Sequence, residues 1–364
     1  ELLAELRRLT GDESLSYDDL RQAHGPLACA VPRGRHPIDS TDLWLTALWN
    51  DGVLRRGDDL VREVFPDLAR GHNAALLRTG DEPTHYHGIL TKRPELDAEL
   101  EEGIVYSATR LEALGSCPRR FFYRYILGVN VPDDPEWDPE SWLTPLERGT
   151  LLHEVYESTL ESARERGVDL DDVAFEEIAH EVFQGAVERM THRVPPPSMA
   201  VHAAEVAALE EDLHAFVSLI RAERPDWIEL ELAFGPGADH EVAVEIGGRR
   251  VSIRGAIDRV DRLESGRLRV VDYKTGTSRQ YRSTRPFHGG RRIQHILYMR
   301  AAESILGEEV EAMEYHFPTR RGENNRIRYG REALGLEREV LDKLFGIARD
   351  GHFITTEDQN DCRY

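Results

Sequence analysis

The spacing of hydrophobic residues changes character near residue 225. Upstream of that point apolar side chains recur every three to four residues, and this period predicts helices over 145–167, 171–191 and 199–222. Downstream, apolar and polar residues alternate through WIELELAF and EVAVEIGGRRVSIRGAIDRVDRLESGRLRVVDYKTG. The alternation, with turn signals at Gly247-Gly248 and Ser265-Gly266, predicts an antiparallel meander of three or four strands.

The helical period returns after the meander. It predicts a helix over 291–306, a further strand within EVEAMEYHFPTRR (309–321) and a last helix over 331–351 that ends at Gly351. Helices therefore precede and follow a mixed sheet, and the fold class is α/β.

The first hundred residues are expected to be mostly helical. STDLWLTALWNDGVLRRGDDLVREVF (40–65) is their most periodic stretch, and Ser40 or Thr41 is a plausible cap. YSATRLEALGSCPRRFFYRYILGV (106–129) predicts an amphipathic helix broken at Cys117-Pro118. We therefore expect a helical region over 1–100 and a second domain over 101–364.

Composition narrows the class of protein. The 364 residues are 40% hydrophobic and 31% charged, which is typical of a globular protein. No run is long enough to span a membrane and no signal peptide opens the chain, so we expect a cytoplasmic protein. Because the chain begins at Glu1, we also expect it to be a piece of a longer protein.

The net charge of −21 argues against a surface that attracts nucleic acid everywhere. Only three of the 46 basic residues are Lys, so a lysine inside a motif draws attention. The acidic, Arg-rich composition fits a salt-rich cytoplasm, or simply high-GC coding. The three cysteines, Cys29, Cys117 and Cys362, do not make a disulfide framework in a chain of this size, and Cys29 is expected to be structural.

Candidate chemistry gathers at the end of the meander. Asp272 and Lys274 are two residues apart, so in a strand they share one face, while Tyr273 points into packing. Asp258 closes the preceding strand, and two aspartates that approach each other are costly unless a cation joins them. Mg²⁺ with two acids and a lysine suits phosphodiester hydrolysis. The alternative is that these charged side chains are ordinary solvent-exposed residues at a strand end.

The wider pattern resembles the PD-(D/E)XK nuclease motif in its RecB-like branch. GAIDRVD and VVDYKTG match the motif strands, RGTLLHEVYE carries His153 ahead of them, and RRIQHILYMR carries Gln294 and Tyr298 behind. Glu231 in ELAF matches the acid of the first strand. The resemblance implies a restriction-endonuclease-like core over about 145–320.

The resemblance also implies roles. His153, Asp258, Asp272 and the backbone carbonyl of Tyr273 would bind Mg²⁺ or Mn²⁺, and Lys274 would position or activate water. Gln294 and Tyr298, which share a helix face, would contact substrate, and Glu231 would join the catalytic set. His153 and Glu231 could instead be an ordinary helix histidine and a solvent-facing strand acid, and Tyr298 could be core.

The segment around Cys117 is similar to the one that opens AddB-type nuclease domains. There the cysteine is the first ligand of a four-cysteine 4Fe-4S cluster, so Cys117 and Cys362 would be two of the four ligands and the given chain cannot complete the site. The cluster would join the two ends of the domain. A packed, free Cys117 is the alternative.

The resemblance to AddB-type proteins also implies a helicase-like region upstream, of which residues 1–100 would be a remnant. It implies a partner subunit as well. No phosphate-binding P-loop motif occurs in this chain. Arg119 and Arg120 among aromatic residues, and Arg291 and Arg292 before the Gln294 helix, are expected to bind DNA.

We therefore expect a metal-dependent deoxyribonuclease, and specifically an exonuclease, from a helicase–nuclease of double-strand-break repair. Two alternatives remain: a non-catalytic DNA-binding module stabilised by an iron–sulfur cluster, and an unrelated hydrolase of small phosphates.

Overall fold

The structure is a computed structural model. It describes residues 2–24, 39–50, 53–54, 59, 62–63, 65–90, 104–130, 138–246, 249–281, 284–356 and 361. They fall into two compact units, Glu1–Glu82 and Pro83–Tyr364. The second unit begins before residue 100 because its first residues pair with its last ones. Leu90 donates its N–H to Gly351 (2.9 Å), and Phe353 donates to Gly88 (2.9 Å).

The first unit is mostly helical, as predicted. Its helices are α1 (Leu2–Thr10), α2 (Tyr17–His24), α3 (Ser40–Leu48) and α5 (Pro66–Thr79). The expected helical stretch 40–65 is interrupted after Leu48, where β1 (Trp49–Asn50) and β2 (Val53–Leu54) pair as a hairpin, and residues 59, 62 and 63 are helical again. The intervening Asn-Asp-Gly sequence favours a tight turn over helix. The cap is Asp39, whose carboxylate accepts the N–H of Asp42 (2.8 Å).

The second unit is built on a mixed sheet. Its strands are β3 (Val105–Ser107), β4 (Trp227–Phe234), β5 (Val242–Ile246), β6 (Arg249–Arg262), β7 (Leu268–Tyr273), β8 (Val310–Phe317) and β9 (Asn325–Gly330). The order is β3-β6-β7-β8-β9, with β4 and β5 also paired to β6. The pairs β3–β6 and β7–β8 are parallel and the others antiparallel. The predicted α/β class and mixed sheet are confirmed, and so is the antiparallel meander.

Strand β9 was not predicted, because its segment reads as a basic patch. Arg326 and Arg328 on β9 form ion pairs with Glu223, Glu314 and Glu311. Those acids come from other elements, so the charge of the segment is used for packing the sheet edge.

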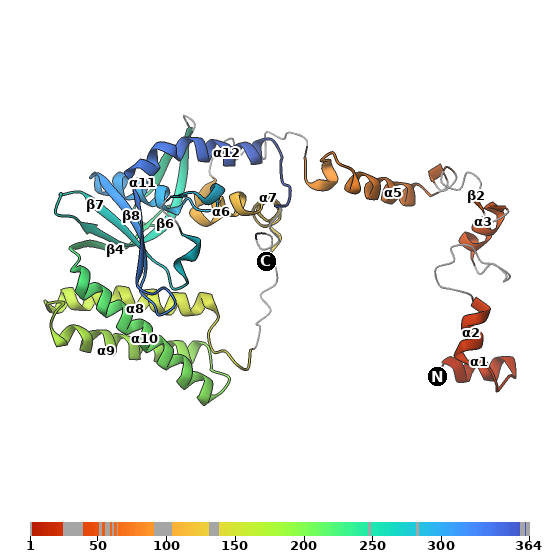
Figure 1. Cartoon of the computed structure of the whole chain (residues 1–364), viewed down its shortest axis with the longest axis horizontal. Coiled ribbons are helices and arrows are strands. Elements are labelled where there is room, and N and C mark those ends of the chain that lie inside the picture. The colour runs from red at the N-terminus through yellow and green to blue at the C-terminus, as the bar shows by residue number, and fades with distance from the viewer. Residues whose placement is uncertain are drawn as a thin grey trace. The chain divides into compact units, whose positions relative to one another are not determined.

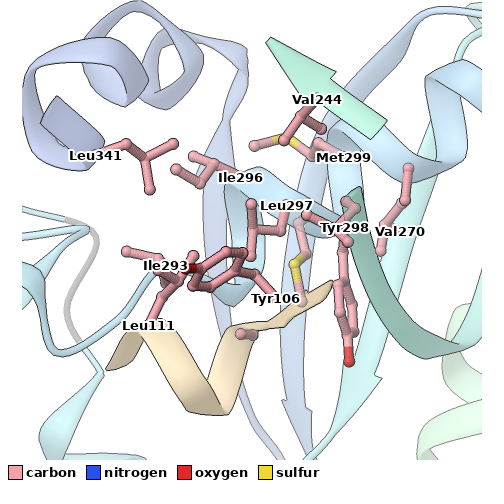
Figure 2. Packing of buried hydrophobic residues seen from close by; sticks show 14 of the residues in the cluster. Tyr106, Leu111, Val244, Val270, Ile293, Ile296, Leu297, Tyr298, Met299 and Leu341 are labelled. Atoms are coloured by element: carbon pink, nitrogen blue, oxygen red, sulfur yellow. The ribbon is translucent and has the colours of Figure 1, made fainter. Parts of the chain in front are cut away.

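Helices cover both faces of the sheet (Figure 1). One layer consists of α8 (Pro145–Arg166), α9 (Val173–Arg193) and α10 (Met199–Glu223), and the other includes α6 (Ala108–Ser116), α11 (Gln294–Leu306) and α12 (Glu337–Arg349). The alternation along β7 divides the core: Val271 and Tyr273 pack with α8–α10, whereas Val270 packs with α11. Figure 2 shows Leu297, Tyr298 and Met299 of α11 in the hydrophobic cluster that also contains Val270.

Shorter helical turns complete the unit. They are α7 (Pro118–Phe121), a π-helical turn (Phe122–Ile126), and 3-10 turns at His85–His87, Ser278–Gln280, His288–Gly290 and Arg331–Leu336. Within the described residues, no helix has the length and apolar character needed to cross a membrane.

Local sequence explains α8, the helix that carries His153. Thr144 and Glu147 form a capping box, and Pro145 occupies the first turn, where its missing N–H costs nothing. Gly167 ends the helix in the left-handed conformation, at φ 63°. The predicted start and end of this helix are confirmed.

Candidate active site

Three carboxylates stand side by side on three neighbouring strands. The pairs Leu230↔Arg259 and Leu232↔Ile257 place Glu231 of β4 opposite Asp258 of β6. Continuing the β6–β7 register by one step beyond Arg259↔Val271 places Asp258 opposite Asp272 of β7. The sheet therefore brings together three acids that are far apart in the sequence.

Asp258 sits where the β6–β7 ladder ends. Its Oδ2 accepts the backbone N–H of Tyr273 at 2.6 Å, in place of a strand carbonyl. The same oxygen lies 3.4 Å from Nδ1 of His153, which reaches the site from α8. Asp258 is 8% exposed, so this carboxylate is buried next to the end of the ladder.

Glu231 adopts an unusual backbone conformation for a strand residue, with φ at 44°. Such a conformation is uncommon for a residue with a side chain and clusters at functional sites. One ligand-type atom from each of His153, Glu231 and Asp258 lies within 4.8 Å of the other two. The structure thus groups Glu231 with the predicted metal ligands.

Mutual repulsion and burial shift the protonation of this group. Burial, with the Asp258 charge second, raises the pKa of Glu231 to about 7. For His153, burial lowers the pKa, but the Asp258 carboxylate outweighs it and raises the pKa to about 9. The Asp258 carboxylate therefore favours a protonated His153 imidazole. A metal ion would have to displace that proton, because only a neutral imidazole can be a metal ligand.

Asp272 of β7 and Lys274, one residue beyond the end of that strand, bring their side chains together, as their spacing predicts. The Lys274 ammonium lies 2.6 Å from Oδ2 of Asp272. Gln294 joins both: its amide donates to Asp272 Oδ1 (2.6 Å) and accepts from Lys274 Nζ (3.1 Å). Burial opposes the charge on Lys274, but Asp272 outweighs it and raises the lysine's pKa.

The carboxyl group of Asp272 itself is deeply buried. Burial raises its pKa to about 6, against the opposing charge of Lys274. Both oxygens are engaged, one by Gln294 and one by Lys274. Asp272 is therefore not part of the group formed by His153, Glu231 and Asp258, although it lies opposite Asp258 in the strand register.

Tyr298 is both a core residue and a neighbour of the site. It is 8% exposed and its ring meets Phe234 edge-on, with 5.7 Å between centroids. Burial raises the pKa of its hydroxyl, which hydrogen-bonds to Gln294 one helical turn away. The shared face of Gln294 and Tyr298 follows from their spacing.

The four arginines expected to bind DNA differ in their surroundings. Arg119 donates to the carbonyl of His87 (2.8 Å), and Arg291 forms an ion pair with Asp361. Arg120 also has an interaction within the protein. Arg292 lines the same cavity as Lys274. DNA binding by the four arginines stays a prediction.

Cys117 joins two helices. It is 1% exposed, ends α6, and its Sγ accepts the N–H of Arg120 (3.5 Å) at the start of α7. Cys362 and Cys29 lie outside the described residues. The iron–sulfur cluster stays a prediction.

Sequence reasoning missed Glu112. Its carboxylate accepts the N–H groups of Ile293 (2.9 Å) and Gln294 (3.2 Å), so it caps α11 from another helix. Burial raises its pKa. No local signal could have revealed this contact across 181 residues.

A second group of side chains that could bind a metal is already paired with arginines of the protein. Its members are Glu223, Glu314 and His316. Glu223 lies 2.7 Å from both Arg259 and Arg269, so cations of the protein already occupy the place of an ion.

The fold and the carboxylate–lysine site define a nuclease class. The family model of the PD-(D/E)XK nuclease superfamily matches residues 105–364, and the chain belongs to this superfamily. Among curated relatives, the B-type subunit of the ATP-dependent helicase/deoxyribonuclease of Moorella thermoacetica is 28% identical over 323 residues, covering 83% of this chain and 25% of that protein. Its counterpart of the same name from Symbiobacterium thermophilum is 28% identical over 275 residues, covering 70% and 23%.

This chain thus spans about a quarter of the length of these relatives. A solved structure titled "Crystal structure of SSO0001" aligns with 68% of this chain and 78% of its own, at 12% identity and a TM-score of 0.27. That likeness is too distant to bear on the fold or the function.

Proposed function

We propose that this chain is a metal-dependent DNA nuclease that hydrolyses phosphodiester bonds, as part of a helicase–nuclease in double-strand-break repair. The observation that carries the proposal is the convergence of His153, Glu231 and Asp258 within 4.8 Å, beside the Asp272–Lys274 pair. The relatives, which are B subunits of an ATP-dependent helicase/deoxyribonuclease, support DNA as the substrate and a helicase–nuclease partner subunit.

The residues present fit a hard divalent cation, Mg²⁺ or Mn²⁺. Adjacent buried acids are costly, as the raised pKa of Glu231 reflects, and a cation relieves that cost. His153, Glu231 and Asp258 would hold it, with Asp272 and the backbone carbonyl of Tyr273 as further candidates. The ion would polarise the phosphate and lower the pKa of a water molecule.

The role of Lys274 follows from its charge. Asp272 raises the pKa of Lys274, which favours the protonated ammonium over a general base. The ammonium would instead stabilise negative charge that develops on the phosphate and orient the attacking water. Gln294, bonded to both Lys274 and Asp272, would fix their positions.

The test uses 5′-labelled linear single- and double-stranded DNA, with Mg²⁺ or with EDTA. We expect cutting only with the metal, and none by Asp272→Ala or Lys274→Ala at unchanged circular dichroism. Full activity of either variant would overturn the assignment. DNA binding without metal-dependent cutting would favour the non-catalytic module.

Exonuclease action is proposed as the mode. A covalently closed single-stranded circle carries no end, so it should survive conditions that degrade the same sequence in linear form. Cutting of the circle at a similar rate would assign an endonuclease instead.

A further inference from the structure

A cavity of about 460 Å³ lies beside the proposed reaction centre. Lys274, Gln294 and Tyr298 form part of its wall, so it is continuous with the site. The N-terminal turn of α6, the end of β4 and Arg254-Gly255 of β6 form the rest, together with Tyr281 and Arg292. Its volume falls in the range of small-molecule sites, roughly 300–1,000 Å³.

The wall of the cavity is cationic in an acidic protein. Arg254, Lys274 and Arg292 all line it, whereas the chain carries a net charge of −21. Among the described residues of the wall, Glu112 is the one carboxylate, and two backbone N–H groups already bind it. Cations gathered in a concave surface focus the field on an anion.

Arg292 is held in place by contacts other than an ion pair. Its guanidinium lies over the Tyr281 ring, 4.7 Å from the centroid, and donates to the Gln280 side chain (3.0 Å). Its Nε is buried and has no hydrogen-bond partner in the described part of the chain. Arg254 is exposed, and across the described ranges neither guanidinium forms an ion pair.

Apolar side chains line the same cavity. Pro236, which follows the end of β4, is exposed in the wall, and the largely buried Phe234 and Tyr298 rings lie beside it. A deoxynucleotide combines one anionic phosphate with a flat base and a sugar, and such a ligand needs both kinds of surface.

We propose that this cavity holds the nucleotide next to the scissile phosphodiester, with Arg254 and Arg292 on its phosphate and the sugar or base against Pro236. The proposal rests on the proposed nuclease function and adds a subsite to it. It assigns Arg254 and Arg292 to substrate binding rather than to the reacting bond.

The experiment measures cleavage of single-stranded oligonucleotides, native or with one uncharged methylphosphonate linkage, mapped bond by bond. The variants are Arg254→Ala and Arg292→Ala. The matched control is Arg338→Ala, an exposed arginine of α12 that pairs with Asp342 on its own helix. Thermal unfolding checks that all variants fold.

Losing a charge-assisted contact to phosphate should raise KM about tenfold to a hundredfold. We expect Arg254→Ala to show this rise with little change in kcat, and Arg338→Ala to behave as wild type. A methylphosphonate flanking the scissile bond should slow wild-type cleavage by a similar factor. In Arg254→Ala the same linkage should cost less than in the wild type, because of the two arginine contacts only that of Arg292 is left to lose.

The two proposals fail in different ways. Wild-type cleavage that Asp272→Ala abolishes, with Arg254→Ala and Arg292→Ala both equal to Arg338→Ala, overturns the nucleotide subsite alone. The same holds if the effects of Arg254→Ala and the methylphosphonate simply multiply. No metal-dependent cutting by the wild type overturns both.

Discussion

The carboxylate of Asp258 accepts the backbone N–H of Tyr273 across 2.6 Å, where the pairing of β6 and β7 ends. One side chain therefore both terminates the ladder and supplies an acid to the site. Its two roles can be separated by mutation.

Asp258→Asn keeps an oxygen that can accept the Tyr273 N–H, whereas Asp258→Ala removes it. We expect both variants to lose cleavage by at least about a hundredfold, since several kcal/mol of charge stabilisation depend on the acid. Asp258→Ala should in addition be less stable than Asp258→Asn by about 1–3 kcal/mol, the cost of a buried N–H without a partner. Urea unfolding measures the difference, and equal stability would contradict the structural role.

His153→Ala should weaken metal binding more than catalysis. Loss of even an outer-shell partner of a metal ligand typically costs about 10–100-fold in affinity. We expect the Mg²⁺ concentration for half-maximal cleavage to rise at least about tenfold, with much of the rate restored at saturating metal. His180→Ala on α9, an exposed histidine, serves as the control. An unchanged Mg²⁺ titration would remove His153 from the ligand set.

Acid should weaken the ion-pair cluster that Glu223 forms with Arg259 and Arg269. Burial raises the pKa of Glu223, but Arg259, His316 and Arg269 outweigh it and lower the pKa from 4.5 to about 2. A lowered pKa stabilises the fold above pH 4.5, and this contribution is lost as the pH falls toward 2. The shift corresponds to about 3 kcal/mol.

Glu223→Gln should therefore be less stable than wild type at pH 7, with the gap closing toward pH 2. Glu211→Gln, on the exposed side of the same helix, should not alter the acid transition. A gap that stays constant between pH 7 and pH 3 would contradict the assignment.

Gly115 of α6 packs against the backbone of Gly290. A Cβ at residue 115 would overlap the carbonyl oxygen of Gly290, and a backbone atom cannot rotate away as a side chain can. Gly115→Ala should destabilise the fold by about 1–3 kcal/mol. At Gly185 of α9 a Cβ would meet only the flexible end of Arg189 at 3.3 Å, so Gly185→Ala should be neutral or stabilise by up to about 1 kcal/mol. Thermal unfolding of the pair measures both effects.

Local sequence determined a large part of this protein. The capping box before Pro145, the glycine after Arg166 and the alternation through β6 and β7 act over a few residues, and the structure has these elements where the sequence predicts them. The two-residue spacing of Asp272 and Lys274 fixed their common face for the same reason.

Tertiary structure decided what depends on partners distant in sequence. Glu231 joins the site because β4 pairs with β6 in a register that faces it with Asp258, at a positive φ that no strand pattern predicts. Glu112 binds the start of α11 across 181 residues. The arginine-rich segment of β9 forms an edge strand because it pairs with β8, where Arg328 meets Glu314. Periodicity reports which face of an element is apolar, whereas strand register and helix docking decide which polar groups meet.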